Sequence, residues 1–428
     1  MIITDVNAWE ALDSRGRPTV AARVVLADGS QGLALVPSGA SAGSHEAVEL
    51  RDGGTRYGGR GVKKAVANIA TVLAPKVIGS TAADVDGILA AADSSRSFST
   101  VGANAVLAVS LAAQRADAAA HGTSLARHLA GDRGPLLLPM PMINILSGGA
   151  HAGAVLDVQD FLAVPLGATS FAEAIEWAAA VRDAATRIGL ARGHAQSVLV
   201  ADEGGLGLPL EANRAALGLL TDAIEAAGLT PGTQVAIAVD IAATQFFRDG
   251  RYRLACEERE LTAEGLVAEI ADWCSRYPIV SIEDILAEDD WEGWQQATAE
   301  LGDRVELIGD DLFVTSGERL RRGIESSVAN SVLVKVNQNG LVSGAREVVD
   351  LARAAGYRTV VSARSGETED SWLSDLAVGW RAGQIKVGST HRSERTAKWN
   401  RLLELEATED TVFAGPWSDG RPAKETTK

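Results

Sequence analysis

The chain has 428 residues, 22% of them charged, and a formal net charge of −16. This length exceeds one ordinary hydrophobic core, so we expect two domains or a barrel with an added domain. The acidic balance argues against nucleic acid or an anionic membrane as a partner. Cys256 and Cys274 form no C-x-x-C motif and indicate neither a disulfide framework nor a zinc site.

The first part of the chain, residues 1–134, is predicted to form a small α+β domain. Residues 2–12 and 19–26 alternate as strands do, and Ala-Asp-Gly-Ser between them and the next apolar run indicates a hairpin turn. A Gly/Ser-rich loop, PSGASAGSHEAVELRDGG, comes next. Helical patterns then follow at about 62–79, 83–93 and 103–130. Gly131 is the expected C-cap of the last helix.

Residues 135–420 are predicted to form the larger domain, an α/β unit of the (β/α)8 barrel type. Its first two apolar segments, LLLPMPMINIL and VQDFLAVPLG, lie too close together for a helical crossover and predict a hairpin-like start. The remainder alternates strand and helix, beginning with a helix at 171–188 and a strand in SVLVADEGG. The N-terminus lacks the features of a signal peptide and no long apolar run occurs, so we expect a cytoplasmic location.

A charged residue follows or ends each of six apolar runs in the larger domain. These residues are Asp240, Glu283, Asp310, Lys335, Arg364 and Lys386. Because the carboxyl ends of successive parallel barrel strands converge on one face, the six side chains are expected to meet in one pocket. Carboxylates suit a divalent metal ion, and lysine and arginine suit phosphate or carboxylate. The pattern therefore predicts a site for metal and an anionic substrate.

Three further residues are candidates for the same pocket. Glu203 opens an EGG turn, His151 lies in SGGAHAG, and Ser41 lies in the loop SGASAG, whose glycines would let it close as a lid. Each has a structural alternative, since a lone acidic residue at a strand end is often a helix N-cap and a lone histidine is often only hydrogen-bonded. Three carboxylates in register favour metal binding over those alternatives.

Several stretches of the sequence resemble the enolase family of phosphopyruvate hydratases. They are ALDSRGRPTV, VPSGASAGSHEAVELRDG, GGAHAG, ADEGG, SIEDIL, GDDLFVT, VLVKVNQNG and SARSGETED, and they occur in the family's order from residue 1 to about residue 400. The resemblance implies a glycolytic enzyme that dehydrates 2-phosphoglycerate to phosphoenolpyruvate with two Mg²⁺ ions. It also implies a homodimer or a multiple of it, and a barrel whose first two strands are antiparallel to the usual order.

The resemblance also assigns roles to individual residues. It implies that Lys335 is the base and Glu203 the acid. The implied metal ligands are Asp240, Glu283, Asp310 and, from the lid, Ser41. The implied substrate-binding residues are His151, Gln159, Asp160, Arg364, Ser365 and Lys386.

The expected chemistry explains these residue types. Removing a proton next to a carboxylate creates an enediolate that needs counter-charge, and the enolase superfamily is an established example of a lysine base working with metal ions. The lysine must be neutral to act as a base, and nearby cations such as Arg364 and Lys386 are expected to lower its proton affinity. Glu203 is expected to keep its proton in a crowded acidic pocket.

Three positions depart from the family pattern. Ala363 stands where the family has a histidine before the phosphate-holding arginine, Asp160 replaces a glutamate, and Ala42 replaces the lid threonine. Substitutions at substrate contacts leave open an enolase-like enzyme of specialised metabolism, similar to carboxyphosphonoenolpyruvate synthase and acting on a related phospho- or phosphono-acid. A non-catalytic binding role is a third hypothesis, which the retained charged residues disfavour.

Overall fold

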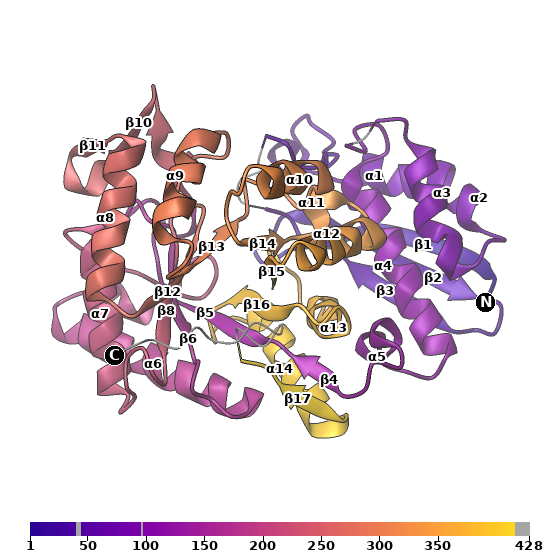
Figure 1. Ribbon diagram of the computed structural model, residues 1–428. Coiled ribbons are helices and arrows are strands. Elements are labelled where there is room, and N and C mark those ends of the chain that lie inside the picture. The colour runs from indigo at the N-terminus through magenta and orange to yellow at the C-terminus, as the bar shows by residue number, and fades with distance from the viewer. Residues whose placement is uncertain (40–43, 96, 416–428) are drawn as a thin grey trace.

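The computed structural model describes residues 1–39, 44–95 and 97–415, which form a small α+β domain beside a larger barrel (Figure 1). The sequence prediction of this fold class is confirmed. The predictions for Ser41 and Ala42 lie outside the described residues. Among the described helices, none is both long and apolar enough to span a lipid bilayer.

The N-terminal domain is built on an antiparallel three-stranded sheet. Its strands are β1 (Ile3–Leu12), β2 (Pro18–Leu26) and β3 (Gln31–Leu35), in that order. Helix α4 (Ala103–Ala120) packs on β2 and β3. Alanine lines this contact, and a Cβ on Gly32 would lie 2.0 Å from the Ala112 carbonyl oxygen, so the small residues permit the close approach. The strands predicted at 2–12 and 19–26 are confirmed, and so is the hairpin, which joins β2 to β3.

The remaining helices of this domain are short. They are α1 (Lys63–Asn68), α2 (Ala74–Val77), α3 (Val85–Ala92) and α5 (Leu125–Ala130), with a π-helical turn (Ile69–Leu73) joining α1 to α2. The prediction of one helix over 103–130 is wrong, because Gly122 has a positive φ of 66° and Ser124 caps a new helix by accepting from the Arg127 backbone N–H. Gly131 is the C-cap, as expected.

The barrel closes through eight strands, each hydrogen-bonded to the next, with the last paired to the first. They are β5 (Met140–Ser147), β6 (Asp160–Val164), β8 (Ala236–Asp240), β12 (Ile279–Glu283), β13 (Glu306–Gly309), β14 (Ser331–Val334), β15 (Arg358–Ser362) and β16 (Gly383–Gly388). The hairpin-like start is confirmed, since β5 and β6 are antiparallel. Only β6 is reversed, however, because β5 runs parallel to β16. The implied reversal of two strands is therefore corrected to one.

Helices surround the barrel. They are α6 (Phe171–Ala191), α7 (Asn213–Ala226), α8 (Ala263–Arg276), α9 (Trp291–Leu301), α10 (Gly317–Glu325), α12 (Val342–Ala354), α13 (Trp372–Gly379) and α14 (Ser393–Thr408), with the short α11 (Val336–Asn339) following β14. The strand predicted in SVLVADEGG is wrong. A 3₁₀ turn (Ala195–Val198) and a loop occupy it, and Val198 and Leu199 are 68% and 64% exposed, so no sheet or core covers this apolar run.

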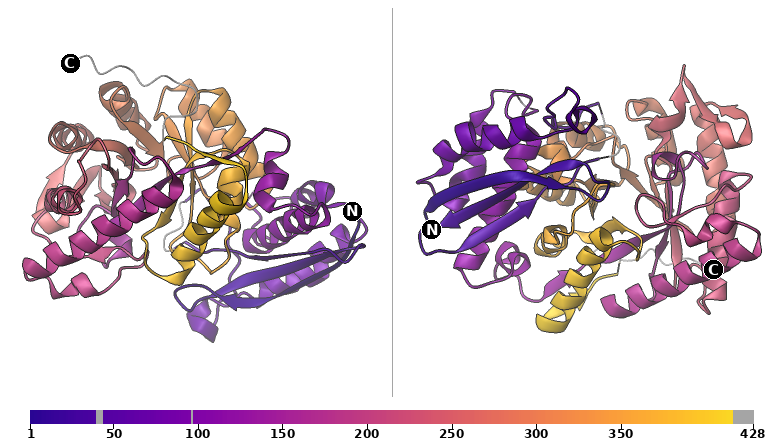
Figure 2. Two further views of the ribbon diagram at one scale, coloured as in Figure 1. Left: turned by 90° about the horizontal axis from the view of Figure 1, so that it is seen from below. Right: turned by 180° about the vertical axis from the view of Figure 1, so that it is seen from behind.

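Smaller strands complete the larger domain. They are β4 (Leu136–Leu138) paired with β17 (Thr411–Phe413), β7 (Leu206–Gly207) at the end of β5, and the sheet of β9 (Phe247–Arg248), β10 (Arg251–Leu254) and β11 (Arg259–Leu261). The barrel interior is filled by apolar side chains, among them Met140, Leu162 and Ile308, so it is a packed core. Figure 2 shows the N-terminal domain lying to one side, against the C-terminal part of the barrel domain.

Candidate active site

The six charged residues of the strand-end pattern lie at one end of the barrel. Asp240 and Glu283 are the last residues of β8 and β12 and are register partners, while Lys386 lies in β16 beside Ser362 of β15. Asp310, Lys335 and Arg364 follow the ends of the strands between them. The parallel arrangement therefore brings all six to the same face, as the spacing predicted.

A cavity opens among these residues. Its lining includes nine of the predicted site residues: His151, Gln159, Glu203, Asp240, Asp310, Lys335, Arg364, Ser365 and Lys386. Glu283 is buried next to them and accepts a hydrogen bond from Lys386. Asp160 is also close but is fully buried, and Ser41 lies outside the described residues.

Acidic and basic side chains neutralise each other on one wall of the cavity. The Lys386 ammonium nitrogen lies 2.7 Å from both Asp240 Oδ2 and Glu283 Oε2. Burial alone would lower the pKa of Lys386, but these two carboxylates raise it well above its ordinary value. Burial and the Asp240 charge raise the pKa of Glu283. Burial also acts to raise the pKa of Asp240, but Lys386, Gln159 and His151 together lower it.

Lys335 forms an ion pair with Asp310, and Gln338 donates to the other oxygen of Asp310 at 3.0 Å. Burial is the largest single influence and lowers the proton affinity of Lys335, but the carboxylates of Asp310 and Glu283 together leave the pKa of Lys335 raised. Arg364 and Lys386 do act in the expected direction, lowering the pKa. Each of these two cations affects Lys335 less than the Asp310 carboxylate does. The expected net lowering of the Lys335 pKa is therefore not found among the protein's own groups.

The donor set fits a divalent cation. Within the part of the chain that the structure describes, the buried Glu283 Oε1 atom has no hydrogen-bond partner. A buried carboxylate oxygen without a partner is costly, and a cation would satisfy it. Asp240 and Asp310 lie at the neighbouring strand ends, and carboxylate oxygens are the ligands that Mg²⁺ prefers. The three predicted ligands are therefore suited to hold Mg²⁺.

Asp284 fixes the strand end that carries Asp310. Its carboxylate accepts the backbone N–H groups of Asp310 at 2.9 Å and Asp311 at 2.8 Å. Burial and the nearby acidic groups raise the pKa of Asp284 well above its ordinary value. This residue directly follows Glu283 in the SIEDIL stretch, but nothing in the sequence distinguished it as a support for the next strand.

The guanidinium of Arg364 is held by Glu46 of the N-terminal domain and by Asn337 of the barrel domain. Its Nη1 atom donates to Glu46 Oε2 at 3.0 Å and to Asn337 Oδ1 at 3.0 Å, and its Nη2 atom donates to Glu46 Oε1 at 3.3 Å. Burial is the largest single influence and lowers the pKa of Arg364, but the charge and hydrogen bonding of Glu46, with the charges of Asp310 and Glu49, together raise it. Sequence reasoning missed Glu46, although it lies in the quoted stretch VPSGASAGSHEAVELRDG.

On the other side of the cavity, Asp160 supports His151. The Asp160 Oδ2 atom lies 2.8 Å from His151 Nδ1, and its Oδ1 atom accepts hydrogen bonds from Asn144 and Ser147. Glu203 Oε1 lies 3.7 Å from the second ring nitrogen of His151. Both oxygens of Asp160 are thus engaged behind His151. Its implied role as a substrate-binding residue stays a prediction.

The surrounding charges shift the pKa values of His151 and Glu203 in opposite directions. Burial lowers the proton affinity of His151, but Asp160 and Glu203 outweigh burial and raise the pKa of His151 to about 9. Burial would raise the pKa of Glu203, yet the charges of His151 and Arg395 lower it. Among the protein's own groups, therefore, the pKa of Glu203 shifts in the direction opposite to the expected retention of its proton.

Gln245 is another lining residue that the sequence did not single out. It lies just after β8, accepts the Ala150 backbone N–H at 3.0 Å and donates to the Gln159 side-chain oxygen. Gln159 in turn donates to Asp240 Oδ2 at 3.1 Å. Gln245 therefore orients Gln159 and the loop that carries His151.

Comparison with protein-family profiles identifies both domains. Residues 3–129 match the profile "Enolase, N-terminal domain", and residues 135–419 match "Enolase, C-terminal TIM barrel domain". The two matches cover nearly all of the chain, in the order in which the two domains lie in the structure. The chain belongs to the enolase family.

Proposed function

We propose that the protein is a Mg²⁺-dependent hydro-lyase that converts 2-phosphoglycerate to phosphoenolpyruvate. The observation that supports this most strongly is the convergence of acidic metal-ligand candidates, a buried lysine and a buried arginine on one cavity. Asp240, Glu283 and Asp310 would hold the metal, which supplies positive charge for the enediolate.

The other residues act on the substrate directly. Lys335 removes the proton next to the substrate carboxylate, for which it must be neutral. Arg364 and Ser365 lie together where the phosphate would bind, since a guanidinium recognises phosphate through two parallel hydrogen bonds. Glu203 delivers a proton to the departing hydroxide on the next carbon.

The direct test is turnover by the purified protein. 2-Phosphoglycerate is supplied with excess Mg²⁺, and phosphoenolpyruvate is measured by its ultraviolet absorbance. We expect product that disappears on chelation of the metal and returns when Mg²⁺ is restored. Absence of product at every substrate and metal concentration would contradict the proposal.

A second candidate function is an enolase-like reaction on a related phosphono-acid, similar to that of carboxyphosphonoenolpyruvate synthase. Two observations favour it: Ala363 presents only a methyl group to the cavity, and Asp160 is withdrawn from it. The test compares wild type with the double variant Ala363→His, Asp160→Glu on 2-phosphoglycerate and on a panel of phosphonate analogues. If the double variant leaves 2-phosphoglycerate turnover unchanged, these positions do not set the substrate and this candidate loses its support.

We also propose a cytoplasmic, glycolytic homodimer. An exposed run of consecutive apolar side chains supports self-association: Val198, Leu199 and Val200 are 68%, 64% and 44% exposed. Light scattering on the eluting peak of a size-exclusion column measures the mass in solution. A monomeric mass at micromolar concentration would contradict the assembly.

A further inference from the structure

Two histidines and an aspartate of the N-terminal domain meet at the junction of helices α4 and α5. Asp117 lies in the last turn of α4, His121 is the C-cap of that helix, and His128 lies in α5. One ring nitrogen of each histidine and one carboxylate oxygen of Asp117 lie within 4.8 Å of one another. None of these three residues lines the barrel cavity, so the group is separate from the candidate active site.

The three side chains come together because the chain turns at Gly122. The positive φ of this glycine, 66°, ends α4, and Ser124 then caps α5. The turn brings the rings of His121 and His128 to 5.2 Å between their centroids. In one continuous helix the two residues would lie about 10 Å apart along the axis, since each residue adds about 1.5 Å. The break between the helices therefore creates the cluster.

The Asp117 carboxylate faces both rings at distances close to those of a metal site. Its Oδ2 atom lies 3.2 Å from His128 Nε2, and its Oδ1 atom lies 3.7 Å from His121 Nδ1. Ligand atoms of a tetrahedral Zn²⁺ ion are about 3.3–3.4 Å apart, because the bonds are about 2.0–2.1 Å long. The pair of Asp117 and His128 already has this spacing. The side chain of His121 is 59% exposed and has room to turn towards them.

The backbone orients the ring of His121 as metal sites require. Its Nδ1 atom lies 2.8 Å from the Asp117 carbonyl oxygen, which only accepts, so Nδ1 carries the hydrogen and Nε2 keeps its lone pair. Metal-binding histidines commonly donate their other ring N–H to a backbone carbonyl in this way. The negative end of the α4 dipole adds attraction for a cation. In the described part of the chain, no lysine or arginine lies within 4.0 Å of the Asp117 carboxylate to compete with a metal.

We propose that Asp117, His121 and His128 bind one Zn²⁺ ion, with solvent completing its coordination. Imidazole nitrogen and carboxylate oxygen are both common ligands of Zn²⁺, whereas Mg²⁺ selects oxygen ligands. The site therefore takes a different metal from the one proposed for the barrel. His128 gives up the hydrogen on Nε2 to solvent when it binds the ion, because only a neutral imidazole with a free lone pair is a ligand.

The consequence of this binding is structural, because α5 is also fixed to the barrel domain. Ser124 Oγ donates to Glu409 Oε1 at 2.9 Å, and Arg127 forms an ion pair with Glu409 at 3.2 Å. The Ala126 N–H donates to Asp375 Oδ1 at 3.2 Å. Helix α4, in turn, packs on the N-terminal sheet. A Zn²⁺ ion that joins α4 to α5 therefore ties this sheet to the barrel.

The test compares Zn²⁺ binding by the full chain, free of any histidine tag, with binding by the double variant His121→Gln, His128→Gln. Isothermal titration gives the stoichiometry, and the comparison removes any Zn²⁺ bound by the barrel carboxylates, which are the same in both proteins. We expect wild type to bind one ion more per chain. Equal stoichiometry, or no Zn²⁺ binding by wild type, would overturn the proposal. No substrate is present, so the result does not depend on the proposed dehydration.

Single variants locate the site and provide a control. His128→Gln should weaken the additional binding event by more than about 100-fold, since loss of an outer partner alone costs about 10–100-fold. His45→Gln is the matched control, because His45 faces one carboxylate, Asp289, at 3.5 Å and belongs to no three-residue group within the described ranges. It should keep the wild-type stoichiometry. Loss of the same binding event in His45→Gln would place the ion elsewhere and contradict the assignment.

Hydrogen exchange and thermal unfolding provide an independent measure. Zn²⁺ at about 100 times its Kd should slow amide exchange across residues 117–130 of wild type and raise its thermal midpoint by about 2 °C or more. The double variant should show neither effect. His121 and His128 are 59% and 22% exposed, so their replacement removes no core packing. Equal protection of this segment in both proteins would refute the site.

Discussion

Glu46→Gln tests the contact through which the N-terminal domain covers Arg364, the proposed phosphate ligand. Glu46 and Arg364 form a two-pronged ion pair at 3.0 and 3.3 Å, and their side chains are only 8% and 5% exposed. The neighbouring Ala47 N–H donates to the Gln338 carbonyl at 2.9 Å, which places this segment against the barrel mouth. If Arg364 binds the substrate phosphate as proposed, the phosphate and the Glu46 carboxylate compete for the same guanidinium.

The expected loss of stability in Glu46→Gln depends on the hydrogen bond to Arg364 that the glutamine side chain retains. Removing one partner of a buried ion pair costs about 3–5 kcal/mol, because the other charge is left buried without compensation. Glutamine keeps one oxygen for Arg364, and a hydrogen bond to a charged group contributes about 1.5–3 kcal/mol. We therefore expect Glu46→Gln to lower the free energy of unfolding by the difference, about 1.5–2 kcal/mol, in phosphate-free buffer.

The same change should strengthen phosphate binding. A competing carboxylate is removed, and each 1.4 kcal/mol of lost competition corresponds to about a tenfold change in affinity. Urea denaturation measures the stability, and isothermal titration with inorganic phosphate measures the affinity, for which we expect a gain of about tenfold. The matched control is Asp370→Asn, which removes the partner of Arg115 in another contact between the domains, 2.7 Å long and away from the cavity lining. Equal or weaker phosphate binding by Glu46→Gln would refute the competition.

Three further predictions concern the base, the metal and acid stability. Lys335→Ala should reduce carbon-2 hydrogen exchange by about 10²–10⁴-fold, as nuclear magnetic resonance in deuterated water measures, and undiminished exchange would exclude it as the base. Mg²⁺ at about 100 times its Kd should stabilise wild type by about 2.7 kcal/mol, and Asp310→Asn should lose most of this gain in thermal shift; equal gains would remove Asp310 from the ligands. Burial alone would raise the pKa of Asp93, but the backbone N–H of Val101 and others in its loop lower it to about 2. Its stabilisation is therefore present above pH 4 and lost as pH falls towards 2, so Asp93→Asn should destabilise at pH 7 and converge with wild type at acid pH.

The strand-end pattern was predictable because it depends on local order. Apolar runs alternating with helices imply parallel strands, and parallel strands place their carboxyl ends on one face. Asp240, Glu283 and Lys386 meet for that reason, with both carboxylates 2.7 Å from the lysine nitrogen. The same rule failed for SVLVADEGG, because an apolar run signals a strand only when a sheet is there to cover it.

The partners of the site residues were not predictable in the same way. Glu46 meets Arg364 across 318 positions of sequence, and Gln245 meets Gln159 across 86. Such contacts depend on how the domains and loops pack, which no local period encodes. The proton arrangement was also beyond the sequence, since the pKa of Glu203 depends on whether burial or the surrounding charges dominate.

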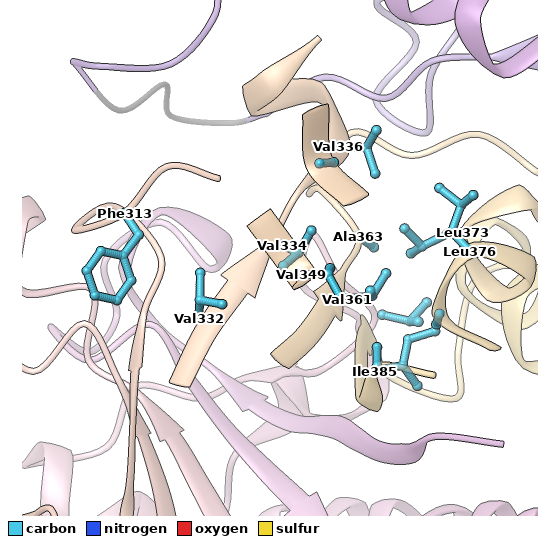
Figure 3. Close-up of a cluster of buried hydrophobic side chains, with 14 of the residues drawn as sticks. Phe313, Val332, Val334, Val336, Val349, Val361, Ala363, Leu373, Leu376 and Ile385 are labelled. Carbon is cyan, nitrogen blue, oxygen red and sulfur yellow. The ribbon is translucent and has the colours of Figure 1, made fainter. Parts of the chain in front are cut away.

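Ala363, the alanine that stands before Arg364, is expected to affect the shape of the cavity without moving Arg364. Ala363 lies at the edge of a buried apolar cluster with Val361 and Leu373 (Figure 3). Arg364 does not depend on that side chain for its position, since its N–H donates to Glu367 Oε1 at 3.0 Å and its carbonyl accepts from Arg395 at 2.7 Å. With alanine at position 363, Arg364 therefore keeps its position, and only a methyl group borders the cavity beside it. A substrate with an additional group next to its phosphorus would meet a methyl group there instead of an imidazole, so position 363 is expected to change substrate choice more than phosphate binding.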